Sequence, residues 1–402
     1  MAGLSLSLLV VVGLLAWHVL VPSEYVAPAP DRAAHRVDPA LATEALHRLE
    51  AAVINDDPAA ARALAPAGDE HAADLLAAVV DNAHDLRVRD FTLRYVDEEG
   101  ALAADGAWQA AVDTTWQLAG FDATQARAEV LFHFVDEGDR IGLAAIGGGG
   151  RQSPLWLADR LEVRRTASTL VAVDGSAAEA DAYAKRAVAA VPVVRRVLPG
   201  WHARLVVEVP RSLDDLARVL AAEPGQYSNI AAVTTTTDGS QAPDAPVHVF
   251  VNPDVFNRLK PQGAQVVMSH EAVHVATGAA TSATPLWLLE GFADYVALRD
   301  VPLPITTTAS QIIREVRKDG PPGHLPGPAE FDTTASHLGA SYESAWLACT
   351  VLAADGGEPA LVRFYREVDG GTPLGTALRR EFGLTERELT DQWRARLSHL
   401  AA

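Results

Sequence analysis

Cysteine is almost absent from the chain. Its 402 residues include a single cysteine, Cys349, and only 2 methionines. No intrachain disulfide can form, so cysteine usage does not distinguish a reducing from an oxidising compartment. Cys349 lies in an apolar helical run, where buried free cysteine is common, and this disfavours a role as a nucleophile.

Positive charge is also scarce. The chain has 33 Lys and Arg against 52 Asp and Glu, which gives a net charge of −19. Such an acidic surface disfavours nucleic acid and other polyanions as partners. The glycine run at 147–150 is not followed by Gly-Lys-Ser/Thr, so it is not a phosphate-binding loop. Abundant alanine, arginine and valine suggest a GC-rich bacterial genome.

Apolar residues, in contrast, are plentiful. They make up 49% of a chain that is too long for one ordinary domain, so two globular domains and an anchor are expected. We predict a transmembrane anchor or signal at 1–22 and a Pro/Ala-rich tether at 23–38. An α+β domain is expected at 39–165 and a second domain at 166–402.

The N-terminus carries the longest apolar run, from Leu4 to Val21, and this run has no charged side chain. At about 1.5 Å per residue, a helix of this length just spans a hydrocarbon core of about 30 Å. The run is longer than a usual signal-peptide core, which favours an uncleaved single-pass anchor. The alternative is a cleaved signal peptide, for which Ala27-Pro28-Ala29 is a weak site. Arg32 and Arg36 follow the run, and on the positive-inside rule they oppose an outside body.

Residues 39–165 combine two periodicities. Apolar residues recur at helical spacing over 41–53 and 69–86, and then alternate over three runs near 91–95, 108–112 and 130–134. Helices followed by a bent antiparallel sheet are similar to the ketosteroid-isomerase-like cone fold, by pattern only and without a motif. We read His133 as solvent-facing or satisfied, and no convincing acid–base pair lies in this segment.

The segment after 166 alternates helices and strands before its central motif. We predict helices at 176–200 and 212–222 and strands at 205–209, 231–236 and 247–251. The sequence does not reveal which strand lies at the edge of the sheet. His248 alternates with two valines and points to one sheet face. It lines a cleft or, as we favour, has a structural role.

The central motif is His-Glu-x-x-His, formed by His270, Glu271 and His274. Two histidines four residues apart on a helix are rotated by only about 40°, so both imidazoles project from one face. Such a pair can chelate a divalent metal, with zinc the default. Glu271 sits beside the metal, where it can take a proton from a metal-bound water.

A catalytic site of this kind needs a third protein ligand. Glu290 lies in an apolar helical segment, where a lone carboxylate would be costly to bury, and a metal bond would offset that cost. Asp294 is one turn further along the same face and can accept the free ring N–H of a ligating histidine. Three protein ligands and one open position are typical of catalytic zinc.

The motif followed by Trp287-Leu-x-Glu-Gly-x-Ala-Asp-Tyr295 resembles the gluzincin metallopeptidases, above all the peptidase-MA-like domains. The resemblance is tight over about 264–300 and looser over about 170–400. It implies a thermolysin-like domain with one zinc ion on His270, His274 and Glu290. It also implies that Glu271 is the general base and that Asp294 supports a ligand. The third histidine of metzincins is absent.

The resemblance carries further expectations. It implies an exported enzyme, so we place the catalytic domain outside the cell membrane. A sheet edge beside the metal helix would pair with an extended peptide. A helix expected at 341–355 makes Tyr342 a candidate donor to the oxyanion, a core aromatic being the alternative; His337 is a second candidate.

Two functions remain open at this stage. The first is a membrane-anchored zinc metallopeptidase, whose partners are a peptide or protein substrate and the membrane. The second is a catalytically degenerate zinc-binding scaffold or regulatory protein at the membrane. An intact Glu271 favours the enzyme, because a structural site does not need that carboxylate. Substrate, cleavage preference and oligomeric state are not fixed by the sequence.

Overall fold

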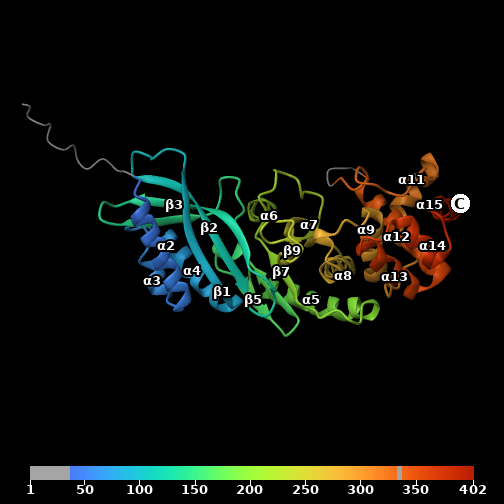
Figure 1. Ribbon diagram of the computed structural model, residues 1–402, viewed down its shortest axis with the longest axis horizontal. Helices are drawn as coiled ribbons and strands as arrows, with labels where there is room; N and C mark the ends of the chain where they lie inside the picture. Colours follow the sequence, from blue (N-terminus) through green and yellow to red (C-terminus); the bar gives the residue numbers. More distant parts are fainter. Residues whose placement is uncertain (1–36, 333–336) are drawn as a thin grey trace, which may run out of the picture.

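The computed structural model describes residues 37–332 and 337–402 and has an α+β fold with two sheets. The first sheet and its helices lie at one end of an elongated molecule, the second sheet lies in the middle, and a helical region forms the other end (Figure 1). The predicted membrane segment, Leu4–Val21, lies outside the described residues. Within 37–332 and 337–402 no helix has the length and apolar character needed to cross a bilayer.

The first layer consists of three helices followed by a sheet. The helices are α2 (Pro39–Ile54), α3 (Pro58–Arg62) and α4 (Glu70–Leu86), and an aspartate side chain caps the N-terminus of each. The strands β1 (Val88–Glu99), β2 (Ala107–Leu118), β3 (Ala126–Asp136) and β4 (Ile141–Ile146) form an antiparallel sheet in chain order. Alternate strand residues such as Trp108, Phe132 and Phe134 are buried with the helices in one core.

The second sheet has the order β5-β6-β7-β9-β8. Its strands are β5 (Glu162–Arg165), β6 (Thr169–Val173), β7 (Leu205–Val209), β8 (Ala232–Thr236) and β9 (Val247–Val251). The three central strands are parallel, whereas β5 and β8 pair antiparallel at the two edges. The boundary predicted between 165 and 166 falls in the turn that joins the paired strands β5 and β6.

The second sheet is covered on both faces. Val171, Val207 and Val249 belong to the core formed with the helices α5 (Ala177–Val197) and α8 (Pro261–Thr277). Leu170 and Phe250 face the other way and belong to the core that contains the first sheet and its helices. The side chains of a strand alternate between the faces, so one sheet serves two cores.

A buried charge network joins the second sheet to the segment between β2 and β3 of the first sheet. His248 on β9 is 1% exposed, with its Nδ1 atom 2.6 Å from Glu208 Oε1 and its Nε2 atom 3.0 Å from Asp122 Oδ1. Burial lowers the pKa of the His248 imidazole, but the two carboxylates outweigh it and raise the pKa to about 9. His248 therefore has a structural place between the two sheets and does not line the metal site.

Helices form the remainder of the chain. After α6 (Leu213–Leu220) and α7 (Pro253–Phe256) come α8, α9 (Leu286–Leu298), α10 (Ile305–Thr308), α11 (Ser310–Asp319), α12 (Leu338–Gly356), α13 (Glu358–Asp369), α14 (Leu374–Phe382) and α15 (Glu386–Ala401). Short 3-10 turns occupy Leu155–Leu157 and Ala279–Thr281. The pair α8 and α9 lies against β8 on one side and α12 on the other, which places the histidine motif at the centre of this half.

Candidate metal centre

Helix α8 presents both histidines of the motif on one face. The helix begins with Pro261 and ends at Gly278, whose φ of 69° is the left-handed conformation that glycine adopts without strain. His270 and His274 are each 7% exposed, and their rings lie edge to face with centroids 4.6 Å apart. Neighbouring apolar residues of α8 are buried, so the imidazoles are held in a largely dry environment.

Helix α9 brings Glu290 to the same point. The Glu290 Oε2 atom lies 3.1 Å from His270 Nε2 and 3.2 Å from His274 Nε2, while the two Nε2 atoms are 2.9 Å apart. Three ligand atoms from two consecutive helices therefore form a small triangle. The sequence predicted these three residues together, and the structure brings them together.

The triangle fits a metal ion. A tetrahedral zinc ion with bonds of about 2.0–2.1 Å separates its ligand atoms by about 3.3–3.4 Å, close to the spacing of these three atoms. His270, His274 and Glu290 form a group that could hold a metal ion, with one atom from each within 4.8 Å of the others. Two neutral imidazole nitrogens and a carboxylate oxygen are also the donor types that such an ion prefers.

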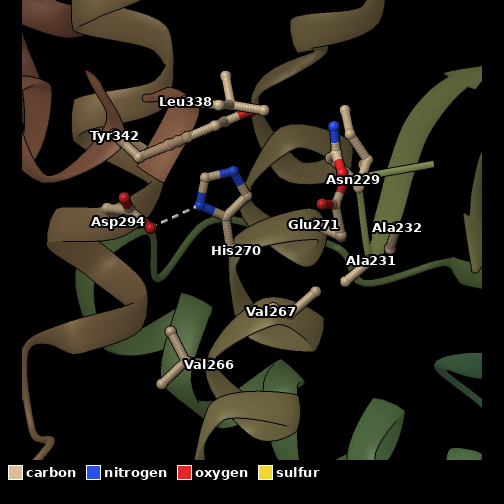
Figure 2. A pocket seen from close by; sticks show the side chains of 11 residues that line it. Asn229, Ala231, Ala232, Val266, Val267, His270, Glu271, Asp294, Leu338 and Tyr342 are labelled. Atoms are coloured by element: carbon tan, nitrogen blue, oxygen red, sulfur yellow. Dashed lines mark hydrogen bonds and ion pairs between the residues drawn. The ribbon is translucent and has the colours of Figure 1, made fainter. Parts of the chain in front are cut away.

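Asp294 fixes the orientation of one imidazole. The Nδ1 atom of His270 donates to Asp294 Oδ1 across 2.8 Å, a contact marked by the dashed line in Figure 2. With its proton on Nδ1, a neutral His270 turns the lone pair of Nε2 toward His274 and Glu290. Asp294 thus lies where the sequence predicted a supporting carboxylate.

The pKa values at the triangle of His270, His274 and Glu290 indicate that a positive charge between these side chains is favourable. Burial alone would raise the pKa of the Glu290 carboxyl, but the charges and hydrogen bonds of His274 and His270 hold it well below its usual range. Burial likewise lowers the pKa of His270, while Asp294 and Glu290 outweigh it and raise the pKa well above its usual range. Either a proton or a divalent cation can supply this charge.

A hollow of about 210 Å³ opens beside the triangle. Its walls come from α8, α9, α12 and the segment that leads into β8 (Figure 2). The apolar lining residues are Ile230, Ala231, Ala232, Val266, Val267 and Leu338, and the polar ones are Asn229, His270, Glu271, Asp294 and Tyr342. A ligand in this hollow would contact a potential metal and mostly apolar walls at once.

Glu271 points into the hollow and has a partner that sequence reasoning missed. The Thr234 hydroxyl on β8 donates to Glu271 Oε2 across 2.7 Å. Glu271 is only 6% exposed, so this donor matters for a carboxylate that has left bulk water. No signal marked Thr234, because it lies in a run of four threonines that predicts only a strand.

Tyr342 on α12 covers His270. The two rings meet edge to face with centroids 5.9 Å apart, and Figure 2 shows Tyr342 above the imidazole. The Phe331 ring also meets Tyr342 edge to face, with centroids 5.3 Å apart. Burial, followed by the charge of Glu290, raises the pKa of the Tyr342 phenol well above its usual range. Tyr342 thus keeps its proton as a hydrogen-bond donor, whereas His337 is exposed and does not line the hollow.

The other residues singled out by sequence lie away from the hollow. His133 is half-buried, and its Nε2 atom lies 3.0 Å from the Gly147 carbonyl oxygen, so its ring is satisfied within the first sheet. Cys349 is fully buried between α12 and α9, and burial raises the pKa of its thiol, which makes it a poor nucleophile.

Comparison with known proteins adds no family to these observations. No protein-family model matches the sequence, and the search of curated proteins gave no significant match. The interpretation of the site therefore rests on its own chemistry.

Proposed function

We propose that the protein is a zinc-dependent metallopeptidase that hydrolyses peptide bonds. In this proposal residues 166–402 form a gluzincin-type, thermolysin-like domain, and 39–165 form an accessory cone domain. An N-terminal single-pass anchor would hold both on the outside of the cell membrane. The observation that carries the proposal is the triangle of His270, His274 and Glu290 atoms beside a hollow into which Glu271 points.

Each residue at the site has a part in the proposed reaction. A zinc ion held by the three ligands supplies Lewis acidity, which makes water nucleophilic near neutral pH and polarises a carbonyl. Glu271 acts as the general base: it takes a proton from the attacking water and delivers it to the leaving amine. Tyr342 donates a hydrogen bond to the developing oxyanion, and its covering position over His270 suits that part.

The position of β8 at the edge of the sheet favours a peptide as the substrate. Ala231 O accepts from Asn252 N and Thr237 N donates to Pro246 O, so odd-numbered residues of β8 face β9 with their backbone groups. Antiparallel pairing alternates, so the backbone groups of Ala232 and Thr234 point to the free side of the sheet. An extended peptide can pair there and lie along the hollow, a common mode of peptide binding.

The alternative is a zinc-binding scaffold or regulatory protein without activity. The two histidine ligands are buried and Glu290 is half-buried, which would suit a stabilising metal as well as a catalytic one. The two functions differ at Glu271, because only the hydrolase uses its carboxylate on a reacting molecule.

Zinc stoichiometry and a proteome-wide cleavage profile test the proposal. We expect one zinc per chain and new peptide N-termini for the wild-type protein. Glu271→Gln should keep the zinc and lose about 10²- to 10⁴-fold in kcat, because a general base contributes that much. Tyr342→Phe should lower kcat and leave the zinc content unchanged, since it removes only a hydroxyl.

Contrary outcomes are equally specific. A protein grown with zinc that contains none would refute the metal assignment. Full activity in Glu271→Gln would refute the assigned base, and a zinc-loaded wild type that cleaves nothing in a broad peptide library would favour the scaffold.

A further inference from the structure

We infer that Thr234 is a positioning residue for Glu271, and that it links the strand on which a substrate would lie to the general base. The inference rests on the proposed function for its catalytic meaning. Its structural content, that one hydroxyl fixes the place of the Glu271 carboxylate, stands on the geometry alone.

The contact between the two residues is close and shielded from solvent. Thr234 Oγ1 lies 2.7 Å from Glu271 Oε2 and 3.3 Å from the Glu271 carbonyl oxygen. A hydroxyl has one proton, and the shorter contact to a charged acceptor receives it. Within the described residues, this is the hydrogen bond that holds the Glu271 side chain, and it engages only one carboxylate oxygen. The second oxygen remains for a proton from water.

Thr234 is suited to hold a carboxylate in one place. Its β-branched side chain has few rotamers, so the hydroxyl does not swing away at low cost. The strand that carries it is fixed by the pairing of Thr234 with Val249 and of Thr235 with His248. His248 in turn is held between Asp122 and Glu208, so β8 is placed by contacts that reach the first domain.

The same residue has a second link, through its backbone. The Thr234 N–H and C=O point to the free side of the sheet, where an extended chain would pair, while its side chain faces α8. Backbone hydrogen bonds to Thr234 would therefore help to set the register of a peptide that pairs with β8, and the side chain of the same residue positions the base. A shift of β8 by a fraction of an ångström would move both together, and misplacement by about 1 Å can cost about 10²-fold in rate.

The test uses three substitutions on the same strand. Thr234→Val keeps the shape and removes the donor, Thr234→Ser keeps a donor, and Thr235→Val changes a neighbour whose side chain faces the opposite side of the sheet. For each full-length, zinc-loaded protein, we would measure kcat and KM separately, zinc content, thermal unfolding and the position of the Glu271 carboxylate in a crystal structure.

We expect Thr234→Val to lose about 10- to 100-fold in kcat with KM and zinc content unchanged. The Glu271 carboxylate should leave its wild-type position in that variant. Thr234→Ser should recover most of the activity and the position, and Thr235→Val should resemble the wild type. The split between kcat and KM and the rescue by serine separate positioning from general loss of structure.

The failure of this inference differs from failure of the proposed function. A Glu271 carboxylate that keeps its place in Thr234→Val, with kcat within a factor of about two of Thr235→Val, would overturn the role of Thr234 and leave the peptidase intact. A wild type without peptidase activity would overturn the proposed function instead. The crystal structures of the three variants would then still decide whether Thr234 fixes Glu271.

Discussion

At the scale of single residues, Asp294 affects the metal site through one hydrogen bond. Asp294→Ala removes the acceptor for His270 Nδ1–H, so the imidazole loses its fixed tautomer and orientation. We expect the zinc affinity to fall about 10- to 100-fold, as is usual for such supporting partners. Competition with a chromophoric chelator measures this change.

Asp294→Asn is the matched control. Asparagine keeps an acceptor oxygen and removes the negative charge, so its affinity should lie between that of the wild type and that of Asp294→Ala. Equal affinity in all three proteins would show that His270 is oriented by its packing alone.

A site residue is easier to predict from the sequence when it lies close along the chain to the residues that it contacts. His270 and Asp294 are 24 residues apart, and His274 and Glu290 are 16 apart, so two successive helices contain the whole ligand set. Helical periodicity and residue chemistry suffice for such local patterns. Thr234 lies 37 residues from Glu271 and on another kind of element, and nothing in its threonine run marks it.

At the scale of elements, the close crossing of α9 and α12 is a second determinant of the site. A Cβ atom at Gly291 would lie 2.6 Å from the Ala345 carbonyl carbon and 3.0 Å from Cys349 Sγ. Gly291→Ala must therefore push α9 away from α12 and move Glu290, its neighbour in sequence. We expect a loss of about 1–3 kcal/mol in the free energy of unfolding, as for overpacked cores, and weaker zinc binding.

Gly263→Ala provides the comparison within α8. A Cβ atom there would meet only Leu259 Cβ, at 4.0 Å, so the helix can accept it. This variant should be more stable by about 0.4–1 kcal/mol, because alanine restricts the unfolded chain. Urea unfolding of both variants measures the two changes, and a Gly291→Ala protein as stable as Gly263→Ala would contradict the crossing described here.

The elements themselves differ in how well sequence foretells them. The strands at 205–209 and 247–251 match the prediction, and the helix expected at 341–355 begins three residues earlier, at Leu338. The order of the strands did not follow from the sequence. The strand next to β7 is β9, although β8 comes first in the chain, and β8 pairs with β9 at the edge. No local pattern records this exchange. The edge position of β8 is thus a property of the folded sheet.

At the scale of the whole molecule, His248 makes the free energy of unfolding depend on pH through its contacts between the two sheets. Its folded pKa of about 9 exceeds the ordinary value of 6.5, so the charged form stabilises the folded state. That contribution is fully present below about pH 6.5 and is lost as the pH rises through 9. It amounts to about 3 kcal/mol, from the shift in pKa.

Urea unfolding of the wild type and His248→Gln at pH 6.5, 7.5 and 9.5 tests this dependence. Titrating groups remote from His248 are shared and cancel in the difference between the two proteins, whereas Asp122 and Glu208 lose their charged partner in His248→Gln and belong to the measured effect. We expect the advantage of the wild type to shrink as pH rises. An advantage that stays constant over this range would show that His248 is neutral in the folded protein.

The network also explains why the sequence favoured a structural role for His248 without naming its partners. Its partner Asp122 is 126 residues away and lies between β2 and β3 of the first sheet. Alternation placed the imidazole on one face of a strand, but only the folded chain reveals what covers that face.

The sheet with two covered faces has a practical consequence for anyone who wishes to dissect this molecule. A fragment that starts near residue 166 would lack β5 and the layer over Leu170, Val206 and Phe250, and would leave Glu208 and His248 without Asp122. Such a fragment would expose an apolar sheet face that also carries charged side chains, and it would tend to aggregate. The smallest piece worth purifying therefore begins before α2, and an inert truncated product would say nothing about the chemistry of the intact chain.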